Sequence, residues 1–238
     1  MKNRLDKELL NRKIVSSRSQ AENYVKLGLV RLNDKTMLKP GYMVSAHDKL
    51  SVEGDQYVSR AALKLASIAK QFALDFRGKT VLDVGSSTGG FTDYALQHEA
   101  KKVIAVDVGT DQLHPSLRVD ERIELHEKTD IRKFSTDDHI DIVVADVSFI
   151  SLRMIMPAVA KLSNKGSQLI MMVKPQFEAG KDQINKGIVK NSSIRRKILK
   201  EFEDWLTANG FIIQDKADSQ VAGTKGNVER FYKLKNRP

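Results

Sequence analysis

The sequence predicts an α/β protein whose parallel sheet is preceded by a small α+β domain. The 238 residues are enough for one full α/β domain and a small second one. From residue 59 onward, short apolar segments alternate with segments of helix length, a pattern typical of a parallel sheet covered by helices on both faces. The first 55 residues instead show two short amphipathic segments followed by strand-like pieces, which indicates a separate domain.

The composition favours a folded cytoplasmic protein. Hydrophobic residues make up 41% and charged residues 29% of the chain. The longest apolar runs, such as 169–173, are far shorter than the roughly 20 residues that a membrane helix needs, and residues 1–12 are charged without an apolar signal segment. The absence of cysteine excludes disulfides, thiolate nucleophiles and cysteine-bound zinc. We therefore expect a cytoplasmic protein with no membrane partner and no metal site.

The net charge of +10 favours a polyanionic partner, of which nucleic acid is the commonest. The excess lies at the two ends: +4 over residues 1–58, zero over 59–179 and +6 over 180–238. A basic surface that only maintains solubility is the alternative explanation. An anionic membrane is a weaker alternative, because no segment joins a basic face to an aromatic or leucine-rich one.

In the first domain, Leu5, Leu9 and Ile14 recur at helical spacing, and residues 17–20 begin a second helix that ends at Gly28. Strand-like pieces follow at 29–32, 43–44 and 50–52. These segments predict a helical hairpin with a β-hairpin. The polar segment 54–56 marks the boundary, so we expect domains of residues 1–55 and 56–238.

In the second domain, the spacing of Leu65, Ile68 and Phe72 predicts a helix over 61–72. The apolar segments predict buried strands at 80–84, 103–106, 140–145 and 168–173, and residues 123–125 predict a further strand between the second and third of these. An amphipathic pattern predicts a long helix over 192–209, which Gly210 ends. Segments 211–213 and 228–234 then predict two closing strands, antiparallel to each other.

The strand at 80–84 runs into a glycine-rich turn, Gly85-Ser86-Ser87-Thr88-Gly89-Gly90, in which backbone N–H groups can approach a ligand closely. The spacing differs from the dinucleotide-binding pattern. A carboxylate at Asp83 would repel a pyrophosphate but suits a ligand that bears an ammonium group. The candidate ligand-binding residues of this segment are Asp83, Gly85, Ser86, Thr88, Gly89 and Gly90.

Two more carboxylates follow strands of the predicted sheet. Asp107 ends the second strand, where an acidic residue can accept both hydroxyls of an adenosine ribose. Asp130 follows the third strand and could accept from an adenine amino group. With Asp83 they fit S-adenosylmethionine, although each of them could instead be an ordinary helix N-cap.

The first domain resembles an S4 RNA-binding domain. The resemblance is carried by Arg4-Leu5-Asp6, Ser17 to Ala21, Gly28 and Lys39-Pro40-Gly41. It implies that Arg4, Arg18, Gln20 and Lys26 lie on the face that grips structured RNA, and arginines near a helix N-terminus suit phosphates. A solvated charged face is the alternative for each of them.

Residues 57–234 resemble the FtsJ (RrmJ) superfamily of ribosomal RNA 2′-O-methyltransferases, and with the S4 domain the chain is similar to the TlyA family, also labelled haemolysins. Five blocks carry the resemblance: 59–65, 83–90, 146–151, 173–178 and 226–229. It implies a Rossmann-like fold that uses S-adenosylmethionine, and an RNA substrate that Arg60 also contacts. Ribosomal RNA or a ribosomal subunit is the implied partner, with cytidine the suggested nucleotide.

The same resemblance places the superfamily's Lys-Asp-Lys-Glu set at Lys64, Asp146, Lys174 and Glu229. A ribose hydroxyl must lose its proton as it attacks the methyl group, and a lysine can accept that proton only if its pKa is depressed. We expect Lys174 to be the base, and Lys64 to tune the pKa of Lys174 and to help position the hydroxyl. Asp146 and Glu229 would orient the lysines, whereas an ordinary ion-pair network is the structural alternative.

Other functions stay open at this stage. An S4 domain joined to a decayed site would be a non-catalytic RNA-binding or haemolysin-like protein. A pseudouridine synthase has no use for the glycine-rich turn, and a nicotinamide dehydrogenase is disfavoured by the turn spacing and Asp83.

The basic run 195–197 lies at the start of the long helix, where its positive charge opposes the helix dipole, so an anion could compensate it. The sequence leaves the oligomeric state open, with a monomer plausible.

Overall fold

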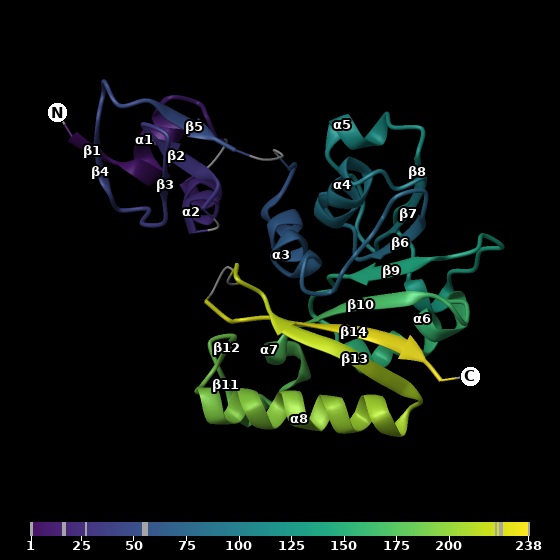
Figure 1. The fold of residues 1–238 in the computed structure, drawn as a ribbon. Coiled ribbons are helices and arrows are strands. Elements are labelled where there is room, and N and C mark those ends of the chain that lie inside the picture. Colours follow the sequence, from purple (N-terminus) through teal and green to yellow (C-terminus); the bar gives the residue numbers. More distant parts are fainter. Residues whose placement is uncertain are drawn as a thin grey trace.

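The computed structural model describes residues 2–15, 18–26, 28–53, 57–221, 223 and 226–237. Figure 1 shows the small N-terminal part beside a larger α/β part, and the predicted fold class is confirmed. The expected domain boundary at 54–56 lies outside the described residues, as does Ser17 at the expected start of the second helix. No helix among the described residues combines the length and the apolar character that crossing a membrane requires.

The N-terminal part contains both predicted helices and more strands than the sequence predicted. Its elements are β1 (Lys2–Arg4), α1 (Leu5–Asn11), α2 (Arg18–Lys26), β2 (Val30–Leu32), β3 (Lys35–Met37), β4 (Met43–Ser45) and β5 (Leu50–Val52). The strands form a three-stranded antiparallel sheet, β3-β2-β5, and a separate β1–β4 pair. Asn33 and Asp34 both have positive φ, as a two-residue hairpin turn requires, and this turn pairs β2 with the unpredicted β3.

The α/β part closely follows the predicted order of elements. Its helices are α3 (Arg60–Ala69), α4 (Gly90–Gln97), α5 (Pro115–Arg118), α6 (Met156–Leu162), α7 (Pro175–Glu178) and α8 (Ser192–Ala208), with short 3₁₀ turns at Ile131–Lys133, Leu152–Met154 and Lys181–Gln183. Its strands are β6 (Thr80–Val84), β7 (Lys102–Val106), β8 (Ile123–His126), β9 (Ile142–Ala145), β10 (Gln168–Val173), β11 (Ile184–Asn185), β12 (Ile188–Val189), β13 (Phe211–Asp218) and β14 (Arg230–Asn236).

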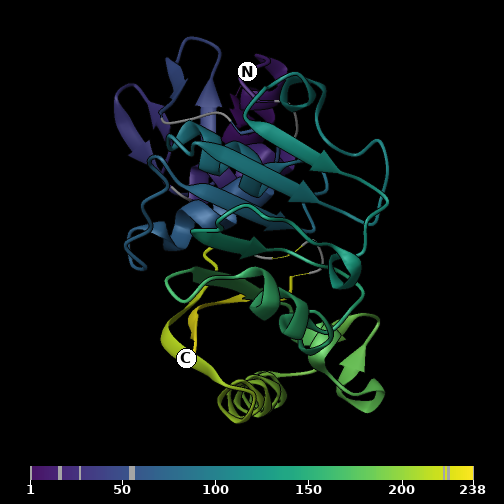
Figure 2. The same cartoon turned by 90° about the vertical axis from the view of Figure 1, so that its right-hand side faces the viewer.

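Seven strands form the main sheet in the order β13-β14-β10-β9-β6-β7-β8. The five from β10 to β8 are parallel, whereas β14 is antiparallel to both β10 and β13. The prediction of two antiparallel closing strands is therefore confirmed, and the first of them is longer than expected. The turned view in Figure 2 shows the twisted sheet, with α8 below its β13–β14 end.

Alternate residues of each central strand pack into two different cores. Val81 and Val103 face the core that contains α3 and α4, whereas Leu82 and Ile104 face the core that contains α6 and α8. Because β10, β9 and β6 are adjacent and parallel, the segments that follow their carboxyl ends meet at one edge of the sheet.

The segment before α3 packs on the helix that follows the glycine-rich turn. The backbone N–H of Val58 donates to Asp93 of α4 at 2.7 Å, and the rings of Tyr57 and Tyr94 lie 5.5 Å apart. A Cβ built on Gly90 would come within 2.3 Å of Ser59 Oγ, so this junction needs glycine. The junction between the two parts therefore contacts α4 directly.

Candidate active site

The glycine-rich turn lies against the segment that follows β9. Gly85 has φ +81°, and a Cβ there would lie 2.9 Å from the carbonyl oxygen of Asp146. Because both the backbone conformation and the close approach exclude a side chain, only glycine fits at this position. Gly89 also has positive φ, but it packs under Leu113 and Leu117 instead of lining a cavity.

Asp83 is buried at the end of β6, with 1% of its surface exposed. Its Oδ2 accepts a hydrogen bond from Thr92 Oγ at 2.7 Å, whereas Oδ1 has no partner among the described residues. Burial raises the pKa of Asp83 to about 7, helped by the charges of Asp146 and Asp107 and opposed by the Thr92 hydrogen bond. No positively charged side chain pairs with this carboxyl group within the part of the chain that the structure describes.

Two connected cavities surround the turn. The smaller, of about 130 Å³, is lined by the predicted residues Asp83, Gly85, Ser86, Thr88 and Gly90. The larger, of about 490 Å³, is lined by Gly85, Asp107 and Asp130, together with Val108, Gln112 and Phe149, which the sequence analysis did not single out. Gly85, Asp146 and Ser148 line both cavities, so a single elongated ligand can reach from one into the other.

The other two predicted carboxylates also bond to the protein itself. Asp107 accepts hydrogen bonds from the backbone N–H groups of Ser87 at 2.8 Å and Gly109 at 2.7 Å. Asp130 caps the 3₁₀ turn at 131–133 and pairs with Arg132, which holds its pKa at about 2. Asp130 thus has the N-cap role that the sequence analysis weighed for it, and it still lines the larger cavity.

The four residues of the predicted catalytic set form two ion pairs. Lys64 Nζ lies 3.1 Å from Glu229 Oε1, with only 7% and 3% of the two side chains exposed. Lys174 Nζ lies 2.5 Å from Asp146 Oδ1. Lys64 lies on α3 and Glu229 directly before β14, so the fold joins residues that are 165 positions apart in the sequence.

All four side chains line one cavity of about 630 Å³. Its wall also contains Arg60, Gln176, Phe177, Ile184 and Asn227. Lys174, Thr88, Asp146 and Ser148 line both this cavity and the small cavity beside the glycine-rich turn. Lys174 therefore borders both spaces.

Ser148 and Phe149 are site residues that the sequence reasoning missed. Lys174 Nζ donates to Ser148 Oγ at 2.6 Å, which gives the lysine a neutral partner beside Asp146. Phe149 has φ +65° and 91% of its surface exposed, and its ring lies 5.3 Å from that of Phe177. Both residues belong to the block 146–151 that carries the family resemblance, which was the available signal.

The predicted RNA-binding residues lie at two places. Arg4 and Arg18 both pair with the buried Asp6, at 2.8 and 2.9 Å, and Arg4 is the main cause that holds the pKa of Asp6 at about 2. Gln20 donates to the hydroxyl of Tyr24, and Lys26 is exposed. Arg60 lies apart from these, in the wall of the large cavity.

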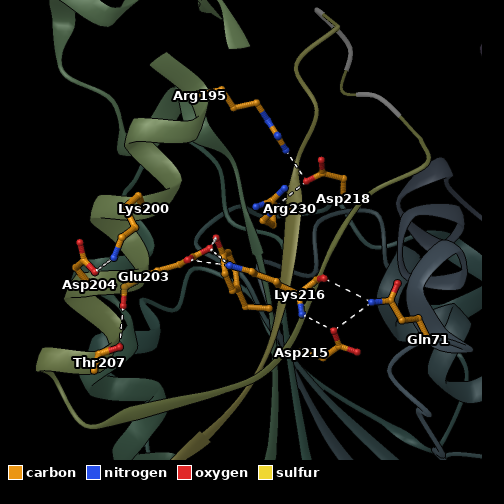
Figure 3. A network of polar contacts seen from close by, with 11 residues as sticks. Gln71, Arg195, Lys200, Glu203, Asp204, Thr207, Asp215, Lys216, Asp218 and Arg230 are labelled. Carbon is orange, nitrogen blue, oxygen red and sulfur yellow. Dashed lines mark hydrogen bonds and ion pairs between the residues drawn. The ribbon is translucent and has the colours of Figure 1, made fainter. Parts of the chain in front are cut away.

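The basic run at the start of α8 is partly engaged within the protein. Arg195 donates to Asp218 at 2.6 Å and to the carbonyl oxygen of Val228 at 3.1 Å, and Arg230 donates to the same carboxylate at 2.7 Å (Figure 3). Arg195 therefore has an anion from the protein itself. Because Val228 precedes Glu229, this cluster also fixes the backbone beside the buried ion pair.

The residues around the glycine-rich turn fit the expected cofactor. Asp83 Oδ1 and Ser86 Oγ are buried polar atoms without a hydrogen-bond partner among the described residues, and both residues line the small cavity. Buried polar atoms are normally paired, so these two indicate a polar ligand. The amino acid end of S-adenosylmethionine has an ammonium group that suits Asp83, while the adjoining larger cavity has room for the adenosine.

Comparisons with known proteins match both parts of the chain. The family model for the FtsJ-like methyltransferase matches residues 57–236, and that for the S4 domain matches residues 3–50. The chain is 40% identical over 186 residues to the "23S rRNA (cytidine-2'-O)-methyltransferase TlyA" of Campylobacter jejuni, covering 77% of this chain and 73% of that protein. It is 36% identical over 241 residues to the "16S/23S rRNA (cytidine-2'-O)-methyltransferase TlyA" of Mycobacterium tuberculosis, covering 98% and 90%.

A solved structure, "Putative hemolysin from Streptococcus thermophilus", is 38% identical and superposes with a TM-score of 0.74. The match covers 99% of this chain and 89% of that one. The similarity thus extends over both the small N-terminal part and the α/β part.

Proposed function

The chain belongs to the FtsJ-like methyltransferase family, and on that premise we propose that it methylates the 2′-hydroxyl of a cytidine ribose in ribosomal RNA. The observation that carries the proposal is the shared cavity. Two lysine–carboxylate pairs line one cavity, and Lys174 and Asp146 also line the adjacent cavity beside the glycine-rich turn.

S-adenosylmethionine supplies an electrophilic methyl group on a sulfonium when it is bound. In this proposal Asp83 holds its ammonium group, Asp107 accepts from the ribose hydroxyls, and Asp130 lies at the adenine end. Gly85 and Gly90 leave room for close packing of the turn, and Ser86 and Thr88 present hydroxyls to the small cavity.

We expect the affinity for S-adenosylmethionine to depend on Asp83 and on pH. Asp83→Asn should weaken binding about 10- to 150-fold, which corresponds to the roughly 1.5–3 kcal/mol of a hydrogen bond to a charged group. The pKa of Asp83 is about 7 in the free protein, whereas an ammonium ligand favours the ionised form. Binding must therefore release a proton at lower pH, so wild-type affinity should fall below pH 7 and approach a tenfold loss per pH unit.

Calorimetric titration of both proteins between pH 5.5 and 7.5 would measure this effect. Asp120→Asn is a matched control, because Asp120 pairs with Arg122 and lines none of these cavities. A pH dependence in the Asp83→Asn protein as steep as that of the wild type would contradict the assignment.

The catalytic role assigned to Lys174 is acceptance of the ribose proton, because the residue borders both cavities. The step requires the amine in its neutral form, with the proton of the ion pair held by Asp146. Asp146 and Ser148 hold this amine from one side. Lys64 would position the acceptor hydroxyl and Glu229 would orient Lys64. The exposed ring of Phe149 at the mouth is suited to stacking on a base, since every base has a flat face.

The S4 domain would bring the enzyme to folded RNA. Arg4 and Arg18 are partly exposed although each pairs with Asp6, so their remaining N–H groups can reach phosphates. Arg60 would contact the RNA beside the acceptor, since it lines the large cavity. We place Gln20 and Lys26 on the same RNA-binding face as Arg4 and Arg18.

The decisive experiment incubates the full chain and tritiated S-adenosylmethionine with ribosomal subunits from cells that lack the corresponding gene. Small and large subunits, and the RNA extracted from each, are tested separately. We expect label in RNA at a cytidine that becomes resistant to alkaline cleavage, because a 2′-O-methyl group blocks that hydrolysis. Absence of label from every sample, or label only at alkali-sensitive nucleotides, would contradict the proposal and leave a non-catalytic RNA-binding protein.

A further inference from the structure

Two segments that border the substrate cavity are joined at three successive places. The segment 146–152 follows β9, and the segment 174–178 follows β10. Lys174 contacts Asp146 and Ser148 at one end. The rings of Phe149 and Phe177 meet in the middle. At the far end, the carboxylate of Glu178 holds Ser151 and Leu152.

Glu178 is a buried carboxylate with both oxygens engaged. Only 2% of its side chain is exposed. Oε2 accepts from Ser151 Oγ at 2.6 Å, and Oε1 accepts from the backbone N–H of Leu152 at 2.7 Å. Arg153 Nε lies 3.6 Å from Oε2 and supplies a positive charge. Burial raises the pKa of Glu178, while these three neighbours oppose the rise.

The segment that Glu178 holds contains a backbone conformation that is unfavourable for a residue with a side chain. Phe149 has φ +65°, in the left-handed region, which costs a residue with a side chain about 1–2 kcal/mol. Lys174 fixes only the beginning of the segment, at Asp146 and Ser148. Without an acceptor at Glu178, the N–H of Leu152 and the hydroxyl of Ser151 would lose their bonds at its end.

We infer that Glu178 is a positioning residue, which fixes Asp146, Ser148 and Phe149 relative to Lys174 without reaching the reacting atoms. Glu178 lines none of the three cavities around the site. It acts on Lys174 through the segment 146–152, and because the effect is on methyl transfer, the inference rests on the proposed function.

The test compares Glu178→Gln and Ser151→Ala with the wild type in single-turnover methyl transfer at saturating cofactor and RNA. Glutamine has nearly the shape of glutamate, but it removes the negative charge that faces Arg153, and its NH2 end keeps the bond to Ser151 only if that hydroxyl reverses its direction and accepts. A displacement of about 1 Å at a reacting group costs about 100-fold, so we expect Glu178→Gln to lose 10- to 100-fold in rate. Ser151→Ala removes one of the two bonds and should lose less.

Glu203→Gln is the matched control. Glu203 is another largely buried carboxylate with two partners, since it accepts from Lys216 and from the hydroxyl of Tyr232, but it joins α8 to β13 and β14 away from the site (Figure 3). The Glu203→Gln protein should lose about as much melting temperature as the Glu178→Gln protein. Its rate of methyl transfer per folded molecule should nevertheless stay within twofold of the wild type.

A double-mutant cycle separates positioning from a general loss of structure. If Glu178 acts through the segment that carries Ser148, Glu178→Gln and Ser148→Ala should share their effect, so the combined loss is smaller than the product of the two. Each of three results would overturn the inference. The first is a transfer rate within twofold of the wild type for both Glu178→Gln and Ser151→Ala. The second is a loss of rate in Glu178→Gln no larger than that in Glu203→Gln, and the third is a combined loss in the double variant that equals the product of the two single losses. An inactive wild type would instead overturn the proposed function itself.

Discussion

Lys174→Ala is expected to slow methyl transfer by a factor of about 10²–10⁴, the usual contribution of a general base. The reason is that Lys174 borders both the cofactor and the substrate cavities and that its amine is held by Asp146 and Ser148. S-adenosylmethionine should still bind within a few-fold of its normal affinity, because Asp83 and the glycine-rich turn remain. Single-turnover transfer and calorimetry measure the two effects separately.

Lys174→Arg sharpens this prediction. Arginine keeps a positive charge beside Asp146 but stays protonated in proteins, so it cannot accept a proton. We therefore expect the arginine protein to be almost as inactive as the alanine protein. Lys79→Ala is the control, since Lys79 also pairs with a carboxylate, Asp141, but lines no cavity of the site. Substantial activity in Lys174→Arg would show that the charge of Lys174, and not its basicity, is what the reaction needs.

Glu229→Ala should destabilise the protein by about 3–5 kcal/mol, because it leaves the buried ammonium of Lys64 without its anion. For a chain of this size, the loss corresponds to a fall in melting temperature on the order of 10 °C. Thermal unfolding followed by circular dichroism measures it. Asp204→Ala removes the exposed pair with Lys200 on α8 and should cost no more than about 0.5 kcal/mol.

The double variant Lys64→Met with Glu229→Leu tests whether the pair is kept for stability or for reaction. Replacing a buried ion pair by apolar side chains is often neutral or stabilising, so this protein should regain most of the stability that Glu229→Ala loses. It should nevertheless stay inactive if Lys64 positions the acceptor hydroxyl. A stable and fully active double variant would argue that the pair is only structural.

Local patterns predicted most of the α/β fold. The parallel strands β6, β7, β9 and β10 were read from apolar segments that are buried on both faces, and α8 from its single apolar stripe. The edge strand β8 is only partly buried. The short strands β1 and β3 were missed, because three residues that are mostly exposed carry little apolar periodicity. The length of β13 was also underestimated, since its outward-facing residues are exposed and polar at the sheet edge.

The candidate site could be predicted as a set of residues but not as an arrangement. Family blocks pointed to Lys64, Asp146, Lys174 and Glu229, yet only the fold shows which lysine pairs with which carboxylate. Glu178 ends the block 173–178, but nothing in the sequence pointed to its contacts, because its partners Ser151 and Leu152 are 27 and 26 positions away and one of the bonds is to the backbone. Contacts between segments that follow different strands depend on which strands are neighbours in the sheet, and the sequence alone does not show that order.

The place of β14 between β10 and β13 has a consequence for shortened forms of the chain. The carboxylate beside Lys64 arrives 165 positions after its lysine, so the pair cannot form before this late strand has been inserted. A chain that ended before residue 228 would lose Glu229 together with β14, whose residues Phe231, Tyr232 and Leu234 are fully buried. Early termination would therefore remove the anion beside Lys64 and the inner strand of this sheet edge in a single event.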